Sequence, residues 1–264
     1  MKLPYFEVAA FTACQFRGNP AGVCPLGRWP GDALLQKIAA ENNLAETAFF
    51  CPRGDDYDLR WFTPTTEVDL CGHATLASAF VAFFELGRHG DTVRFHSRSG
   101  PLSVTREGSI LTLDFPSRSP EPCVAPEPLL RGLGGRPAEI LKARDYMAVF
   151  ASAGEVSALR PDFELLRQVQ SLGVIATAPG TDCEFVSRFF APAAGIPEDP
   201  VTGSAHCTLI PYWSRRLGKA EMFARQVSSR GGALRCRLVG DRVHIGGEAV
   251  MYLRGELQIN DSEL

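Results

Sequence analysis

Short runs in which apolar and polar residues alternate recur along the chain and predict that strands dominate the fold. In one such run Leu111, Leu113 and Phe115 fall on one face of a strand, and the polar residues between them fall on the other. Similar runs, rich in Val, Phe, Ile and Thr and bounded by Gly, Pro or Asp, occupy residues 5–11, 47–51, 58–62, 92–96, 146–152, 174–178, 184–190, 242–245 and 251–259.

Four segments show helical spacing instead. The first starts at Asp32, a predicted N-cap, and extends to about residue 42. Residues 73–86 are apolar on almost every side, which predicts a helix buried all round that stops at Gly87. The other two are expected at residues 163–172 and 203–217. Pro211 predicts a kink in the last of these.

The chain repeats itself on either side of a proline-rich segment, residues 116–137, which we interpret as a linker between two lobes. Residues 60–64 read Arg-Trp-Phe-Thr-Pro and lead through an acidic loop to Gly72. Residues 188–192 read Arg-Phe-Phe-Ala-Pro and lead through a second acidic loop to Gly203. Each copy predicts a strand, a turn and a glycine that opens a helix, so the chain is interpreted as two copies of one unit.

The two helix starts at Gly72 and Gly203 are candidate anion sites. The first N–H groups of a helix have no partner within it, and the helix dipole adds partial positive charge there. Glycine at this position allows a ligand to approach the backbone closely. If the two starts face each other across a cleft, they hold one small anion from both sides; the alternative is two ordinary helix starts far apart.

Composition narrows the range of functions. The net charge is −3, so the chain has no basic field for a nucleic acid partner, and the near-neutral balance gives no reason to expect a membrane surface. The longest apolar run, residues 74–84, is too short to span a bilayer. The eight cysteines include no Cys-x-x-Cys pair and no zinc-like cluster with histidine, and the first residues do not resemble a signal peptide. We therefore expect reduced thiols, a cytoplasmic protein and no metal site.

Glu46 is the candidate acid–base residue. It stands between the first helix and an apolar strand, where lost solvation should raise its pKa and suit it to take and return a proton. The alternative is a surface glutamate at a strand start. His73 and Ser204 occupy matching positions after the two glycines and could contact a substrate, or they could be a core histidine and a capping serine. Asp69 and Asp199 lie in the acidic loops and could simply stabilise the helix starts.

Cys71 supports a rival chemistry, because a thiolate is favoured at a helix start. Its counterpart in the repeat is Thr202, so a mechanism with two thiols is unsupported. A Cys71–His73 dyad of a hydrolase is disfavoured, since such neighbouring positions rarely align their side chains. No dinucleotide, phosphate-loop, serine-hydrolase or zinc-protease motif is present, which argues against a nicotinamide or metal enzyme.

Four segments resemble the phenazine-biosynthesis-like isomerase family. They are residues 19–23 (Asn-Pro-Ala-Gly-Val), 44–49, 69–75 and 198–206, and residues 226–232 resemble a further motif of one branch. The resemblance implies an α+β, diaminopimelate-epimerase-like fold with two pseudo-symmetric lobes, each a barrel-like, mostly antiparallel sheet around a central helix. The implied lobes are residues 1–116, with the last strand, residues 251–264, packing back on them, and residues 117–250.

The resemblance also implies a homodimer that needs no cofactor and a glutamate mechanism in the cleft between the lobes. The catalytic residues carried over from the family pattern are Glu46, His73, Asp199 and Ser204. The implied contacts to a small carboxylate-bearing substrate come from Asn19, Gly72, Ala74, Gly203 and Ala205. We expect a cofactor-independent isomerase in which Glu46 moves a proton. The alternatives are a Cys71-dependent epimerase, racemase or dehydratase, and a non-catalytic ligand-binding protein on the same fold.

Overall fold

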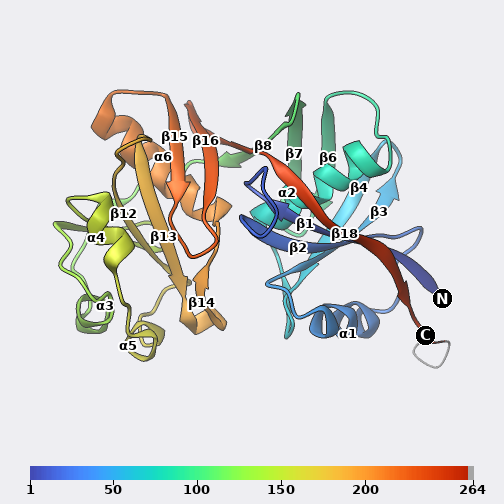
Figure 1. Ribbon diagram of the computed structural model, residues 1–264, viewed down its shortest axis with the longest axis horizontal. Coiled ribbons are helices and arrows are strands. Elements are labelled where there is room, and N and C mark those ends of the chain that lie inside the picture. The colour runs from blue at the N-terminus through green and yellow to red at the C-terminus, as the bar shows by residue number, and fades with distance from the viewer. Residues whose placement is uncertain (261–264) are drawn as a thin grey trace. The chain divides into compact units, whose positions relative to one another are not determined.

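The computed structural model describes residues 1–260 (Figure 1). The chain forms two compact units: the first joins Met1–Asp114 to the chain from Gly246 onward, and the second is Phe115–Ile245. The sequence placed the boundary after residue 116 and the start of the returning segment at 251; the structure places both a few residues earlier. Residues 261–264 of that predicted segment lie outside the described residues.

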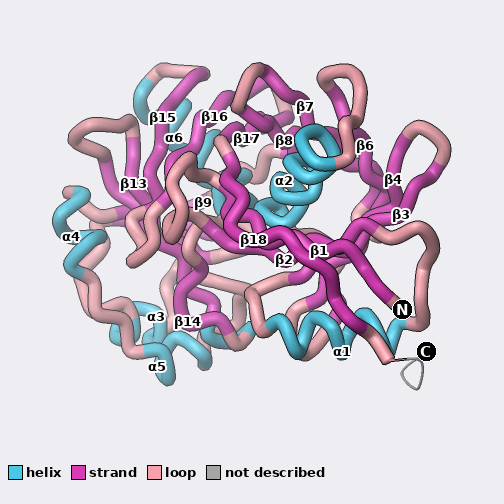
Figure 2. The backbone as a smooth tube through the Cα atoms, turned by 45° about the vertical axis from the view of Figure 1, so that its right-hand side comes forward, coloured by secondary structure: helices cyan, strands magenta, loops and turns pink. Residues whose placement is uncertain are grey.

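The first unit is a sheet of long strands with two helices. Its strands are β1 (Lys2–Ala10), β2 (Asn19–Pro25), β3 (Thr47–Arg53), β4 (Asp56–Phe62), β5 (Glu67–Val68), β6 (Thr92–Ser97), β7 (Gly100–Glu107), β8 (Ile110–Pro116) and β18 (Ala249–Gln258). Its helices are α1 (Asp32–Asn42), α2 (Gly72–Phe80) and the π-helical turn η1 (Val81–Glu85). The strands pair in the order β18-β1-β2-β3-β4-β6-β7-β8, and all neighbours are antiparallel except β2–β3 and β4–β6. Figure 2 shows β18 running alongside β1.

Helix α2 is the centre of this unit. All residues from Gly72 to Ala79 are buried, as the sequence predicted for a helix apolar on every side. It packs against β1, β2 and β3, and Figure 1 shows it among the strands of the unit. The predicted helix of residues 73–86 is split, because its last turn widens into η1 before Gly87, whose φ is +67°.

The second unit repeats this plan. Its strands are β9 (Glu121–Pro122), β10 (Glu139–Lys142), β11 (Tyr146–Val149), β12 (Val174–Pro179), β13 (Phe185–Ala191), β14 (Ile196–Asp199), β15 (Glu221–Gln226), β16 (Gly232–Val239) and β17 (Arg242–Gly247). Its helices are α3 (Glu127–Gly132), α4 (Ala153–Ala158), α5 (Phe163–Arg167), the 3₁₀ turn η2 (Pro192–Ala194) and α6 (Gly203–Leu217). The strand order is β9-β10-β11-β12-β13-β15-β16, with β11–β12 and β13–β15 parallel.

The same alternation of parallel and antiparallel pairs therefore occurs in both units. Strand β4 pairs with β5 before α2, and β13 pairs with β14 before α6. This agreement confirms the repeat that the sequence predicted from residues 60–74 and 188–205. The observed α+β architecture, two similar units each built on a mostly antiparallel sheet, is the predicted one.

Pro211 lies inside α6, where its ring removes one N–H from the helix. The carbonyl that would have accepted that bond belongs to Cys207. It accepts instead from the backbone N–H of Arg118, at 2.8 Å. The helix runs through the proline because a neighbouring segment satisfies the freed acceptor.

Three predicted elements need correction. The proline-rich segment, residues 116–137, is no linker: it contains β9 and α3, and Leu129 and Leu133 are fully buried in the core of the second unit. Two of its prolines mark the start of α3, since Pro126 is the N-cap and another proline occupies the first turn. The helix predicted at residues 163–172 ends at Arg167. The N-cap of α1 is Gly31, and Asp32 is the first residue of the helix itself.

Candidate active site

Glu46 lies in the short turn between α1 and β3. Asn43 ends α1 in the left-handed region, at a φ of 50°. The backbone N–H of Gly22 in β2 donates to the Glu46 carbonyl at 3.2 Å, which fixes the turn against the sheet. Only 13% of the Glu46 side chain is exposed, so the turn holds this carboxyl group largely out of water. The predicted rise of its pKa stays a prediction.

The start of α2 presents backbone N–H groups to this region of the unit. Cys71 is the N-cap, in extended conformation. The first helical hydrogen bond runs from the N–H of Thr75 to the Cys71 carbonyl at 3.1 Å. The N–H groups of Gly72, His73 and Ala74 precede it and have no acceptor one turn back in the helix. Together with the helix dipole they favour negative charge at this point.

Three side chains meet at that helix start. His73 Nε2 lies 3.3 Å from Glu46 Oε2, and His73 Nδ1 lies 3.5 Å from Cys71 Sγ. Burial lowers the pKa of His73 to about 3, so the imidazole is neutral near pH 7. The contact with Glu46 is thus one between a carboxyl group and a neutral ring. The thiol and imidazole do align, and the expectation that positions 71 and 73 would not bring them together is wrong.

Of the predicted substrate contacts in the first unit, Asn19 lies on the strand beside the glutamate turn. It begins β2 and is fully buried. It stands three residues before Gly22, whose N–H binds the Glu46 carbonyl. Gly72 and Ala74 are both in the first turn of α2. The structure therefore gathers Glu46, His73 and the predicted contacts Gly72 and Ala74 in one small region, with Asn19 on an adjacent strand.

The start of α6 in the second unit is braced by side chains. Thr202 is its N-cap, and the Thr202 hydroxyl donates to Asp199 Oδ2 at 2.5 Å. The buried amide of Gln226 accepts from the Thr202 N–H at 2.8 Å and donates to the Asp199 carbonyl at 2.8 Å. Ser228 donates to the carbonyl of Pro200 at 2.8 Å. Gln226 and Ser228 belong to the motif at residues 226–232 that the sequence singled out without a role; the structure shows that they hold this loop.

Ser204 has a cationic neighbour that the sequence did not indicate. Arg144 donates to Ser204 Oγ at 3.1 Å. The same guanidinium is held by the buried Asp145, at 2.6 and 3.0 Å, and its side chain remains 30% exposed. The α6 start, with Gly203 and Ala205 in its first turn, thus combines the first N–H groups of a helix with the guanidinium of Arg144. No sequence signal marks Arg144, because it lies sixty residues away along the chain.

Two matching ion pairs hold the strands that lead to the two helices. Arg60 makes bidentate contacts with Glu67 at 2.7 and 2.8 Å. Arg188 makes bidentate contacts with Glu198 at the same two distances. The equivalent acids are therefore Glu67 and Glu198. Asp69, which the sequence paired with Asp199, is exposed and has no such environment.

His206 provides a test of the buried interior of the second unit. Its Nδ1 donates to the Thr202 carbonyl at 2.9 Å, and burial lowers its pKa to about 4, against 6.5 for a free histidine. Because the folded pKa is the lower one, this group contributes its full stability above pH 6.5 and loses it as the pH falls towards 4. Between pH 7 and pH 5 it should account for about 2 kcal/mol of lost unfolding free energy.

The variant His206→Asn keeps a donor for Thr202 but cannot titrate. We expect its unfolding free energy, measured by urea denaturation, to fall by about 2 kcal/mol less than that of wild type between pH 7 and pH 5. An identical pH dependence in both proteins would contradict the assignment.

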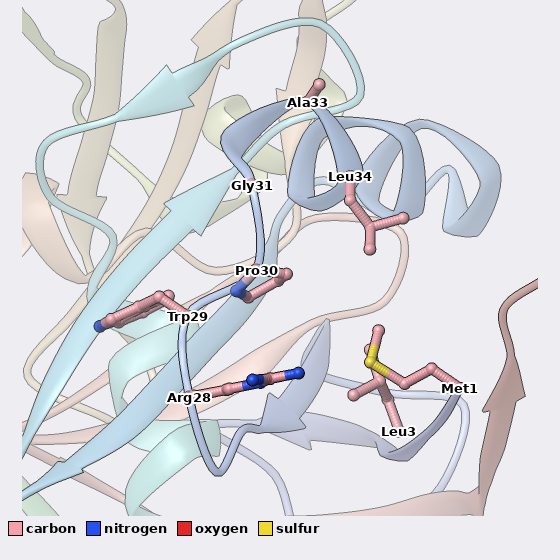
Figure 3. Close-up of a pocket in the computed structure, with 8 residues that line it drawn as sticks. All are labelled: Met1, Leu3, Arg28, Trp29, Pro30, Gly31, Ala33 and Leu34. Atoms are coloured by element: carbon pink, nitrogen blue, oxygen red, sulfur yellow. The ribbon is translucent and has the colours of Figure 1, made fainter. Parts of the chain in front are cut away.

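Three surface pockets of the first unit surround α1 and contain none of these residues. One, of about 330 Å³, is lined by Met1, Leu3, Arg28, Trp29, Pro30, Gly31, Ala33 and Leu34 (Figure 3). Two others, of about 300 and 430 Å³, lie along α1 towards Ile259 and beside Arg60. None of the residues that line these pockets is a predicted site residue.

A largely buried glutamate beside a neutral imidazole at a helix start is suited to proton transfer on an anionic substrate. The carboxyl group can take or give a proton, and the helix N–H groups can stabilise negative charge that forms during the transfer. The two repeated α+β units place the protein in the class of epimerase-like folds. Comparison with known proteins identifies the family.

The chain belongs to the phenazine biosynthesis-like protein family, whose model matches residues 8–255. A Pseudomonas aeruginosa protein named as an uncharacterized isomerase is 51% identical over 98% of this chain and 100% of its own length. The crystal structure of a phenazine biosynthesis protein of the PhzF family from Enterococcus faecalis is 46% identical, covers 98% of this chain and 100% of that chain, and superposes with a TM-score of 0.96. A probable proline racemase from Agrobacterium radiobacter, 13% identical over 98% of this chain and 93% of its own, shares the fold alone, with a TM-score of 0.63.

The length and composition of the helices decide whether any of them could span a membrane. Within residues 1–260, no helix has both the length and the apolar composition to cross a bilayer.

The isomerase names among the relatives support isomerase as the enzyme class.

Proposed function

We propose that this protein is an isomerase that moves a proton on a small carboxylate-bearing substrate, with Glu46 as the general acid and base. The observation that carries the proposal is the contact of 3.3 Å between the Glu46 carboxyl and the neutral ring of His73 at the start of α2. The isomerase names among the relatives support the reaction class.

In the proposed reaction the Glu46 carboxylate removes a proton from carbon. The bonding electron pair moves into the conjugated system of the substrate, and the N–H groups of Gly72 and Ala74 stabilise the charge that develops there. The proton on Glu46 exchanges with solvent, and the carboxyl group then returns a proton to another position, so the substrate gains and loses no atom or electron overall. His73, held by Cys71 on its other side, orients the Glu46 carboxyl group.

In the second unit we assign carboxylate binding to the start of α6. Ser204, Gly203 and Ala205 supply donors, and Arg144 supplies positive charge beside Ser204. Asp199 keeps the loop in place through Thr202. That one substrate contacts both helix starts stays a prediction.

Arg144 is the residue with which to test this assignment. We expect Arg144→Met to weaken binding of the active carboxylate by about 10- to 100-fold, because a charge-assisted hydrogen bond is lost, while Arg144→Lys recovers part of the loss. Isothermal titration of the acid into each variant measures the effect. Equal affinity in wild type and Arg144→Met would contradict the role.

We also propose that the protein forms a homodimer, needs no cofactor and is located in the cytoplasm. Asn19 is expected to contact the substrate from β2. The non-catalytic alternative, a binding protein on the same fold, differs from the proposal in one observable way, which is the absence of proton exchange on any bound acid.

The proposal is tested by a screen of small cyclic carboxylates and amino acids in deuterated water. We expect at least one acid to be recovered with solvent deuterium on carbon, and its product to be a positional or stereochemical isomer, as read by mass spectrometry and NMR. An acid that binds at the site but never acquires deuterium would favour the non-catalytic alternative.

A further inference from the structure

Cys71 neither takes nor gives a proton in the proposed reaction, yet its thiol lies in the same cluster as the Glu46 carboxyl group. Glu46, Cys71 and His73 each offer one metal-ligating atom, and these atoms all lie within 4.8 Å of one another. The sequence contained no zinc-like spacing because Glu46 comes from a turn far from residues 71–73. The expected absence of a metal site stays a prediction, and this cluster is one place where it can be tested.

We propose that Cys71, His73 and Glu46 bind one zinc ion, and that the bound ion inhibits the isomerase. The first part concerns the binding site alone. The second part rests on the proposed function, because inhibition requires Glu46 to be the group that moves the proton.

The contact between Cys71 and His73 has the spacing of two ligands in a tetrahedral zinc site. Bond lengths of about 2.3 Å to sulfur and about 2.1 Å to nitrogen place these two atoms about 3.6 Å apart around the metal. The separation of Cys71 Sγ and His73 Nδ1 is 3.5 Å. Glu46 Oε2 is 3.3 Å from the other ring nitrogen, Nε2, so its side chain must turn towards Nδ1 to share a metal there. The possible ligand atoms of the three residues lie within 4.8 Å of one another, which keeps the Glu46 carboxyl group within reach.

The ligand chemistry selects zinc over the common hard cations. A thiolate and an imidazole favour zinc, whereas magnesium and calcium prefer oxygen ligands. Cys71 is at a helix N-terminus, where a thiolate is favoured, and a bound metal removes the thiol proton outright. Thiolate and carboxylate together neutralise the charge of the ion. Three protein ligands leave a fourth position for water.

A metal in this position would occupy the atoms that proton transfer needs. The Glu46 oxygen bound to zinc can no longer accept a proton from carbon, and a ligating His73 no longer orients the carboxyl group. Zinc should therefore stop the reaction while leaving the fold of the unit intact.

The binding part is tested on the full chain, freed of metal with a chelator and titrated with zinc against a chromophoric competitor. We expect one zinc ion per chain and an affinity that falls by at least about 100-fold in Cys71→Ser and in Cys71→Ala. The matched control is Cys14→Ser, which removes an exposed thiol of the same unit and should bind zinc as wild type does. Cobalt should give a thiolate-to-metal charge-transfer band in wild type and Cys14→Ser that is missing in both Cys71 variants.

Circular dichroism of the Cys71 variants verifies that they fold. Zinc binding that is undiminished in Cys71→Ser and Cys71→Ala, or no stoichiometric zinc in wild type, would overturn the site. Inhibition is measured separately, as solvent deuterium exchange of the metal-free enzyme with and without one equivalent of zinc. Full exchange activity with zinc bound would overturn the inhibition and leave the role of Glu46 untouched. Zinc bound at Cys71 in a chain whose metal-free form exchanges no acid would support the site and overturn the proposed function.

Discussion

Glu46→Gln should lower the rate of solvent deuterium exchange into the active carboxylate by about 10³-fold. Glutamine has nearly the same shape as glutamate but can neither accept nor return a proton, and general acid–base catalysis typically contributes 10²- to 10⁴-fold. Substrate affinity should change little, because the proposed anion contacts are helix N–H groups and not Glu46 itself. The loss is therefore expected in kcat, with KM nearly constant.

The matched control is Glu41→Gln. Glu41 lies in α1, five residues before Glu46, and is exposed, so the substitution removes the same charge from the protein without touching the site. We expect its exchange rate to stay within about 2-fold of wild type. An exchange rate for Glu46→Gln within 5-fold of wild type would remove Glu46 from the mechanism.

The second large effect is on stability. Arg188 is 9% exposed, and its guanidinium binds Glu198 in bidentate fashion and also the carbonyl groups of Val156 and Leu159, at 3.2 and 3.0 Å. Arg188→Met leaves a largely buried carboxylate and two carbonyl groups without this donor. We expect it to lower the unfolding free energy of the second unit by about 3–5 kcal/mol.

A double-mutant cycle isolates the pair. In Arg188→Met combined with Glu198→Met the uncompensated charge is gone, so the loss should be smaller than in Arg188→Met alone. A pair on the surface of the same unit, Arg225 with Asp182, has side chains 47% and 57% exposed. Arg225→Met should cost less than about 1 kcal/mol. Urea unfolding followed by circular dichroism gives these values, and equal losses for Arg188→Met and Arg225→Met would contradict the account.

Local sequence patterns predicted most of the strands and helices of the fold. The runs that predicted β3, β6 and β12 alternate or are continuously apolar, and each is a strand within a residue or two of its predicted bounds. The repeat could be predicted because each copy contains an arginine followed by the glutamate that it binds. Arg60 binds Glu67 and Arg188 binds Glu198, so the two copies show the same order of residue types. The π-helical turn η1 after α2 could not be predicted from the sequence, because an apolar segment looks the same whether its turn is α or π.

Most residues of the candidate site were predicted from their place at a helix start, and Glu46 from its apolar neighbours in the sequence. Gly72, His73, Gly203 and Ser204 follow from that rule. Arg144 and Gln226 meet the α6 start through the pairing of distant strands, which no local pattern reveals. No local pattern showed that Cys71 lies near Glu46 either. The position of the turn that contains Glu46 depends on β2 and β3, which are distant from Cys71 in the sequence.

Deuterium exchange measured side by side in Glu46→Gln and Cys71→Ser, with the same active acid and metal-free proteins, tests the central claim most directly. The account predicts that exchange is lost in the glutamine variant and falls by less than about 10-fold in the serine variant, since the thiol touches the imidazole and not the reacting carbon. Loss of exchange in Cys71→Ser with exchange retained in Glu46→Gln would make the thiol the proton-moving group and contradict the mechanism.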